Sequence, residues 1–328
     1  MDKNEVGKLT DELHANNVIN KGGYRDGICS RSYSIGEQYR GAVKSAPIVM
    51  SIPKRKLLES RKLWAHAENE SLTLPIHWLL RDDLQHLSID ELVAWKIVNS
   101  LPTEVKRFYN SVALVHFVTK QHRSSVDRFG KRFHSNITSL NSRLRELLRV
   151  DGDRLVSNDV RNCQMLCLSG VIGTATEDAQ RFREACEMGQ LYESLQSNGI
   201  SRNEVKEQLQ PYLFGKPRMT GFSRIVTELY PTIDSYLRNW KSKPLTESER
   251  LVDLLDEPHK RTASTLQRME SSIVIETACA EIKRLKRNAF LATVHDSILC
   301  REVDCELVQR QIKIAFYMKG LNCLIKAS

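Results

Sequence analysis

Two aspartates stand where apolar runs end, and their chemistry and placement suit them to bind metal ions. Asp296 lies between the runs 289–294 and 298–300, a pattern that predicts two buried strands joined by a tight turn. Asp159 ends another short strand, and an apolar helix is expected to follow at 164–168. Two carboxylates held in this way can share a pair of divalent cations, which stabilise the attacking and leaving oxygens of a phosphoryl transfer. For Asp296 alone, the alternative is an Asp that only caps its own turn.

A segment between the two aspartates carries two cations at helical spacing. Ser201 is a suitable N-cap, and Arg202 and Lys206 follow at positions i and i+4, on one face of the expected helix. Both cations can hold a triphosphate from there. The alternative is an exposed basic helix face. Phe214 and Gly215 close the segment.

In its order of residue types, this segment resembles the fingers helix of the family A DNA polymerases and the related single-subunit, phage-type RNA polymerases. Asp159 and Asp296 then match the two palm aspartates of that superfamily. The resemblance implies that the aspartates bind the metal ions and that the two cations bind the triphosphate. It also implies that Phe214, Gly215 and, upstream of the helix, Tyr192 contact the nucleotide.

Two further blocks extend the resemblance to roughly residues 128 to 300. Residues 130–140 look like the segment before the first palm Asp that touches the primer or template backbone. Residues 267–270 open a helix that resembles the one preceding the His-Asp turn. The resemblance implies contacts to nucleic acid from four side chains, which are Arg132, Gln267, Arg268 and His295.

Three positions bear on the choice between deoxyribonucleotides and ribonucleotides. Gln164 stands where DNA polymerases of the family place a Glu that crowds the ribose 2'-OH, whereas the RNA polymerases have a small residue. The bulk of Gln164 favours exclusion of ribonucleotides. Phe214 lacks the hydroxyl of the usual Tyr, and Ser297 replaces the usual Glu of the DNA polymerases. The choice of sugar is therefore open at this point.

The resemblance implies an α+β right-hand polymerase core with a palm antiparallel sheet, helical fingers and a reduced helical thumb. The predicted activity is that of a small DNA-directed DNA polymerase without an exonuclease domain, in which a primer 3'-OH attacks the α-phosphate of a nucleoside triphosphate. Two Mg²⁺ ions at Asp159 and Asp296 are the expected cofactors, with Mn²⁺ as an alternative. One rival is an RNA polymerase or primase with the same site. The other is a degenerate palm that only binds nucleic acid, against which the retained charges argue.

Composition agrees with a polyanionic partner. The formal net charge is +9 and the pI is about 9.1, which favours nucleic acid. The expected partners are a DNA template-primer and nucleoside triphosphates, and an accessory protein is left open.

The eight cysteines show no zinc-finger spacing and mostly sit in apolar runs, which indicates buried thiols in a reducing compartment. The sequence has no signal-peptide core and no run of about 18 apolar residues, so no membrane span is expected. The expected location is the cytoplasm of a bacterial cell or of a cell infected by a virus or mobile element.

The domain prediction follows from this order of blocks. It comprises a flexible leader (1–50), a helical thumb-like region (51–127), a first palm part (128–170), fingers (171–258) and a second palm part (259–328).

Local patterns predict several element boundaries. Ser88 and Glu91 have the spacing of a capping box, and Thr103 is expected to begin another helix. Pro211 predicts a kink in the fingers helix and Pro231 a break between two helices. A basic helix is expected over 54–65 and a last strand over 321–325.

Overall fold

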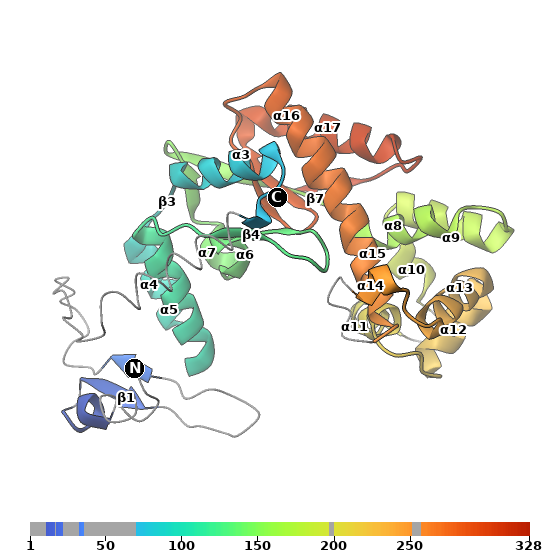
Figure 1. Cartoon of the computed structure of the whole chain (residues 1–328), viewed down its shortest axis with the longest axis horizontal. Coiled ribbons are helices and arrows are strands. Elements are labelled where there is room, and N and C mark those ends of the chain that lie inside the picture. Colours follow the sequence, from blue (N-terminus) through green and yellow to red (C-terminus); the bar gives the residue numbers. More distant parts are fainter. Residues whose placement is uncertain (1–10, 17, 22–32, 36–69, 197–199, 251–256) are drawn as a thin grey trace.

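The computed structural model describes residues 11–16, 18–21, 33–35, 70–196, 200–250 and 257–328 (Figure 1). Most of the predicted leader at 1–50 and the whole predicted basic helix at 54–65 lie outside these residues. Within the leader, β1 (Ile19–Lys21) pairs with β2 (Tyr33–Ile35) in antiparallel orientation. In the part of the chain that the structure describes, every helix is too short or too polar to cross a membrane.

A six-stranded antiparallel sheet forms the centre of the molecule. Its strand order is β3-β6-β7-β9-β8, and β10 also pairs with β7. The strands are β3 (Leu87–Ile89), β6 (Leu148–Val150), β7 (Asp153–Val160), β8 (Ala292–Val294), β9 (Ser297–Arg301) and β10 (Ile325–Ala327). Strand β7 therefore has β9 on one edge and β6 and β10 on the other.

The side chains of β9 alternate between two hydrophobic cores. Ile298 and Cys300 belong to the larger core, whereas Leu299 belongs to the smaller one on the opposite face. Because β8 and β9 are joined by only His295 and Asp296, the predicted pair of buried strands with a tight polar turn is confirmed.

The larger core lies between the sheet and a set of helices that includes one long helical run. This run crosses the molecule from the sheet to the helical bundle at the right of Figure 1. It contains α15 (Lys260–Ser271), a π-helical segment η3 (Ser272–Cys279) and α16 (Ala280–Leu285). The other members are α3 (Pro75–Asp83), α8 (Cys163–Ile172) and α17 (Cys305–Tyr317), the last preceded by the short helix η4 (Glu302–Asp304).

A helical bundle is inserted between α8 and α15, where fingers were predicted (Figure 1). The break at Pro231 is confirmed, because one helix ends at Leu229 and the next begins at Pro231. The bundle contains α9 (Glu177–Glu187), α10 (Leu191–Ser194), α11 (Arg202–Phe214), α12 (Gly221–Leu229), α13 (Pro231–Ser242) and α14 (Glu247–Arg250).

The smaller core packs short elements against the other face of the sheet. Thr103 caps α5 as predicted, but the capping box at Ser88 is wrong. Ser88 lies in β3, where its hydroxyl donates to the Arg149 carbonyl, and Asp90 caps the next helix instead. The elements on this side are η2 (Leu84–His86), α4 (Glu91–Asn99), α5 (Glu104–Val118), α6 (Asn136–Ser139) and α7 (Ser142–Arg145). The hairpin of β4 (Ser124–Val126) and β5 (Phe133–Ser135) contacts α6, but its Val126 and Phe133 pack in the larger core.

The fold is thus a mixed α+β architecture built on an antiparallel sheet, with many helices. Cysteine placement also agrees with the sequence, since six of the seven described cysteines are buried and none forms a disulfide. The boundaries between palm, fingers and thumb stay predictions.

Candidate active site

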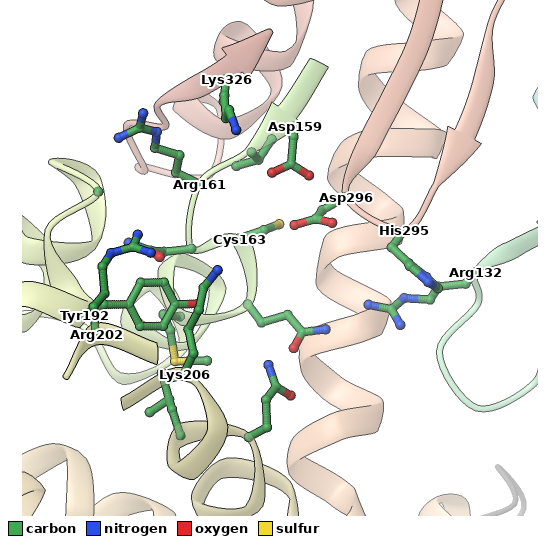
Figure 2. Close-up of a pocket in the computed structure, with 17 residues that line it drawn as sticks. Arg132, Asp159, Arg161, Cys163, Tyr192, Arg202, Lys206, His295, Asp296 and Lys326 are labelled. Atoms are coloured by element: carbon green, nitrogen blue, oxygen red, sulfur yellow. The ribbon is translucent and has the colours of Figure 1, made fainter. Parts of the chain in front are cut away.

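A pocket of about 550 Å³ opens where the sheet meets the helical bundle (Figure 2). It is lined from the sheet side by the end of β7, the β8–β9 turn, β10 and the first turn of α8, and from the bundle side by α10 and α11. The structure gathers eight of the predicted site residues around it, which are Arg132, Asp159, Gln164, Tyr192, Arg202, Lys206, His295 and Asp296.

Strand pairing brings the two aspartates together. Asp159 lies opposite Ser297 in the β7–β9 ladder, and Asp296 is the residue before Ser297. Within the described residues, neither carboxylate forms an ion pair or a hydrogen bond with another side chain. Both nevertheless face a pocket rather than open water, so they are held ready for a ligand that supplies positive charge.

The surroundings shift the acidity of both aspartates. Burial raises the pKa of Asp159, and the positive charges of Lys326 and Lys206 oppose this rise. Burial raises the pKa of Asp296 to about 7, and the negative charges of Glu270 and Asp159 add to the rise. Near neutral pH, Asp296 is therefore protonated part of the time, and a cation that enters the pocket favours proton loss.

A strained turn sets the position of Asp296. His295 has a φ of 57°, in the left-handed region that non-glycine residues adopt at a cost. This conformation lets the chain reverse within two residues between β8 and β9. The turn leaves the His295 side chain and the Asp296 carboxylate at the pocket rim (Figure 2).

A buried carboxylate, which has no role in the sequence prediction, lies beside the pocket. Glu270 of α15 is 1% exposed and accepts two hydrogen bonds of 2.9 Å from the Arg132 guanidinium. Gln164 of α8 donates to the same carboxylate at 3.4 Å. Burial raises the pKa of Glu270, and Arg132 counters that rise. Glu270 thereby fixes two pocket-lining side chains, Arg132 and Gln164.

Helix α11 presents its predicted cations to the pocket. Ser201 and Glu204 form a capping box at its first turn, as the Ser201 prediction requires. Arg202 and Lys206 both lie over the ring of Tyr192, with the Arg202 Cζ 5.1 Å and the Lys206 Nζ 5.5 Å from the ring centroid. The aromatic ring therefore positions the two cations.

The two cations differ in their partners. Arg202 forms an ion pair with Glu193, in which the Nε···Oε1 distance is 2.7 Å. Lys206 forms no ion pair or hydrogen bond within the described residues. Lys206 is therefore the more available of the two for an anionic ligand.

Four predicted contact residues lie away from the pocket lining. Phe214 is the last residue of α11 and packs partly buried against the larger core, while Gly215 caps the helix by donating its N–H to the Pro211 carbonyl. Pro211 lies inside this helix, and the kink predicted there stays a prediction. The other two residues, Gln267 and Arg268, face the loop before β5.

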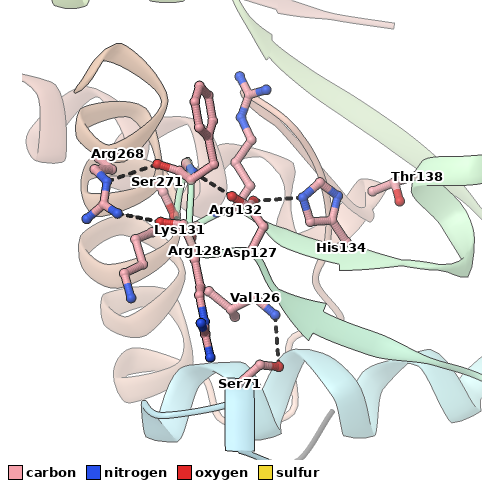
Figure 3. A network of polar contacts seen from close by, with 12 residues as sticks. Ser71, Val126, Asp127, Arg128, Lys131, Arg132, His134, Thr138, Arg268 and Ser271 are labelled. Carbon is pink, nitrogen blue, oxygen red and sulfur yellow. Dashed lines mark hydrogen bonds and ion pairs between the residues drawn. The ribbon is translucent and has the colours of Figure 1, made fainter. Parts of the chain in front are cut away.

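Arg268 and its neighbours anchor the 127–132 loop (Figure 3). The Arg268 guanidinium donates to the backbone carbonyls of Phe129 and Arg128, and the Gln267 side chain fills the space next to Gly130. Since any Cβ on residue 130 would collide with Gln267, this close approach requires glycine.

Asp127 organises the same loop from within. Burial alone would raise its pKa, but hydrogen bonds from His134 and from the Gly130 and Arg132 N–H groups outweigh burial and hold the pKa at about 2. The loop is therefore fixed at both ends, and it delivers Arg132 to the pocket.

A second groove, of about 870 Å³, runs between α5 and the β4–β5 hairpin. Serine, threonine and asparagine side chains alternate in its wall with cations and with the partly exposed Tyr109 and Val112. Its basic residues are His116, Arg123, Arg128, Lys131 and His134.

Sequence reasoning missed two cations that line the pocket. Arg161 follows Asp159 by two residues, and Lys326 belongs to β10. Its position in the sequence, two residues after Asp159, was a usable signal for Arg161. No pattern in the sequence indicates that Lys326 lies near Asp159.

The donor atoms at the site suit a hard divalent cation bound together with a substrate. Within the described residues, no group of three or more His, Cys, Asp or Glu side chains is placed to hold a metal ion. Mg²⁺ in nucleotide sites uses one or two carboxylates and completes its shell with water and phosphate oxygens. Asp159 and Asp296 fit that requirement. The neighbouring Cys163 does not compete, because its contact with Cys167 and its burial raise its pKa well above the ordinary value.

Comparison with known proteins finds distant structural likenesses. No family model matches the chain, and no curated protein matches it either. Among solved structures, the polymerase domain of Pol1 from M. smegmatis, in complex with a DNA primer-template and dNTP, is similar at 12% sequence identity and a TM-score of 0.43. The match covers 63% of this chain and 47% of that chain, so this chain spans about half the length of the polymerase domain. A likeness this distant carries no argument about function.

Proposed function

We propose that the protein is a template-directed nucleotidyltransferase, a small DNA polymerase of the family A type. One observation carries the proposal. Strand pairing places Asp159 and Asp296 side by side at a pocket whose opposite wall presents Lys206 and Arg202. Two carboxylates facing two cations suit a substrate that brings both metal ions and phosphates.

In the proposed reaction, the primer 3'-OH attacks the α-phosphate of a nucleoside triphosphate and pyrophosphate leaves. Asp159 and Asp296 would hold Mg²⁺, or Mn²⁺ in its place, which supplies charge stabilisation for the attacking and leaving oxygens. Lys206 offsets the charge of the triphosphate, and Arg202 joins it once released from Glu193.

The proposed DNA contacts lie along the second groove. Cations there alternate with hydroxyl and amide groups, a composition that suits a phosphate backbone. Arg268 and Gln267 act indirectly in this scheme, because they hold the loop that presents Arg128 and Lys131.

The proposed sugar selectivity depends on Gln164. Its amide is tied to Glu270 and its side chain lines the pocket, so it presents a fixed bulk to the nucleotide. Ser297 is buried, its hydroxyl lies 2.6 Å from that of Ser157, and it is not among the residues that line this pocket. This arrangement favours deoxyribonucleotides over ribonucleotides.

Extension of a labelled primer on a DNA template with Mg²⁺ tests the proposal. The wild-type protein and Asp159→Ala are compared, with dNTPs alone and with NTPs alone, alongside a gel-shift measurement of DNA binding. We expect extension with dNTPs, and a loss of at least about a thousandfold in Asp159→Ala with DNA binding retained. Asp153→Asn is the matched control, since Asp153 is an exposed residue of the same strand.

Each other outcome selects a rival. Extension with NTPs but not dNTPs would make the protein an RNA polymerase or primase. DNA binding without extension in either mixture would favour a subunit that only binds nucleic acid. Full activity in Asp159→Ala would refute the assignment of the site.

A further inference from the structure

Strand β10 places a lysine directly across from the Asp159 carboxylate. Lys326 is the cross-strand neighbour of Asp159 in the antiparallel β7–β10 pair, so both side chains project from the same face. The register is fixed at both ends, by paired hydrogen bonds between Ser157 and Ser328 at 2.9 and 3.1 Å and by the bond from Arg161 N–H to the Leu324 carbonyl at 2.9 Å. Lys326 is therefore held at the pocket by the sheet itself.

Among the described residues, three of the five Arg and Lys side chains at the pocket form no ion pair. Arg132 is paired with Glu270 and Arg202 with Glu193. Arg161, Lys206 and Lys326, in contrast, make no side-chain ion pair or hydrogen bond within the described residues. These three line the pocket that contains Asp159 from separate elements, namely the residue after β7, α11 and β10.

Figure 2 shows how these cations are arranged. Lys326 and Arg161 extend from the upper side of the pocket, and Lys206 rises from below with Tyr192 beside it. Asp159 lies close to Lys326, while Asp296 lies further toward His295. Unpaired cations on two sides of the pocket leave a space between them that suits an elongated anion.

We propose that Lys326 and Arg161, together with Lys206, bind a polyphosphate group. This group is the triphosphate of the incoming nucleotide before the reaction and the pyrophosphate that leaves after it. These three cations are called the binding arm below. The idea rests on the proposed function for the identity of the ligand, but the binding of polyphosphate itself does not require catalysis. Lys326 is then a substrate-binding residue supplied by the last strand of the sheet. Each unpaired cation contributes a charge-assisted contact to a phosphate oxygen.

A different role for Lys326 would be to balance the charge of Asp159 without touching a ligand. The two roles predict different measurements. A charge-balancing lysine affects the affinity of the site for Mg²⁺, whereas a phosphate-binding lysine affects the binding of polyphosphate when no metal is present.

The test is isothermal titration of inorganic tripolyphosphate into the full chain in EDTA, for the wild type, Lys326→Ala, Lys326→Arg and Arg161→Ala. Lys326→Ala and Arg161→Ala are each expected to weaken binding about 3- to 10-fold, while Lys326→Arg retains most of the affinity. Lys319→Ala and Arg310→Ala, exposed cations outside every described pocket, serve as controls and are expected to bind like the wild type. Thermal unfolding confirms that each variant is folded.

Steady-state primer extension gives a second readout. In Lys326→Ala the KM for nucleotide and the inhibition constant for pyrophosphate should rise together, with kcat changed less. Unaltered tripolyphosphate binding in Lys326→Ala and Arg161→Ala, or no binding by the wild type, would overturn the inference. The wild type could instead bind tripolyphosphate but extend no primer, while the variants bind tripolyphosphate more weakly. In that case the binding arm stands and the polymerase proposal fails.

Discussion

Arg132 and Glu270 are joined by two hydrogen bonds of 2.9 Å next to the candidate site, although they come from distant parts of the chain. The Glu270 side chain is 1% exposed and that of Arg132 is 14% exposed. Removal of one partner leaves a buried charge without compensation. We therefore expect Glu270→Ala and Arg132→Ala each to lower the free energy of unfolding by about 3 to 5 kcal/mol.

Urea unfolding followed by circular dichroism measures this effect. The double variant Arg132→Met with Glu270→Leu should recover most of the loss, because no charge remains to be desolvated. The exposed pair Arg284 and Glu281 is the control, and Glu281→Ala should leave the midpoint unchanged. If the single variants at Arg132 and Glu270 were as stable as the wild type, the pair would contribute no net stabilisation.

Binding of Mg²⁺ should depend on pH through Asp296. Its pKa is raised to about 7 by burial and by the negative charges of Glu270 and Asp159. A proton then competes with the metal below that pH, so affinity should increase from pH 6 to pH 8 and level off above. Titration of Mg²⁺ at these pH values, without nucleotide, measures the slope, and a pH-independent affinity would contradict the prediction.

The raised pKa of Asp296 also predicts how Asp296→Asn changes the stability of the folded protein. The folded state holds this proton more tightly than the unfolded state, so ionisation of Asp296 costs stability as pH rises from about 4 through 7. In EDTA, Asp296→Asn should therefore unfold at a higher temperature than the wild type at pH 8 and at nearly the same temperature at pH 4. A difference of equal size at both pH values would argue against the raised pKa.

Lys206→Ala should weaken nucleotide binding more than Arg202→Ala. Lys206 has no ion-pair partner within the described residues, whereas Arg202 must first leave Glu193. Loss of a charge-assisted contact worth about 1.5 to 3 kcal/mol corresponds to a rise of roughly 10- to 100-fold in the KM for nucleotide in Lys206→Ala. Steady-state kinetics of primer extension measures both variants, and a larger defect in Arg202→Ala would reverse the assignment.

Gln164→Ala should relax the choice of sugar. The side chain lines the pocket and its amide is fixed by Glu270, so its loss leaves room for a 2'-OH. A steric contact of this size is worth roughly 10- to 200-fold in discrimination. The ratio of kcat/KM for dNTP and NTP measures it, with Gln210→Ala, another pocket-lining glutamine, as the control. An unchanged ratio would remove Gln164 from the selectivity of the site.

The sequence predicted the features whose signals are local. The strand-turn-strand around Asp296, the helix after Asp159 and the cap at Ser201 all follow from periodicity and capping, and all three are confirmed. The meeting of Asp159, Asp296 and Lys206 at one pocket also agrees with the expectation.

Features set by tertiary partners could not be predicted in this way. The last strand was expected at 321–325, but it spans Ile325–Ala327, because pairing with β7 rather than local hydrophobicity sets its position. Lys326 was therefore not predicted as a site residue. A sequence also does not reveal which group an arginine contacts. Arg132 binds Glu270, and Arg268 binds backbone carbonyls.

The position of β7 within the sheet bears on how the chain acquires its site during synthesis. The strand that carries Asp159 is paired on one edge with β9, about 140 residues later in the sequence, and on the other with β10. Contacts this distant in sequence form slowly, and ribosomes release the chain from the N-terminus onward. The helical bundle has thus left the ribosome before β9 or β10 can pair with β7, and the pocket gains its last lining residue only when Lys326 emerges. Nascent chains that stop short of this point contain Asp159 but lack the lysine that lies opposite it.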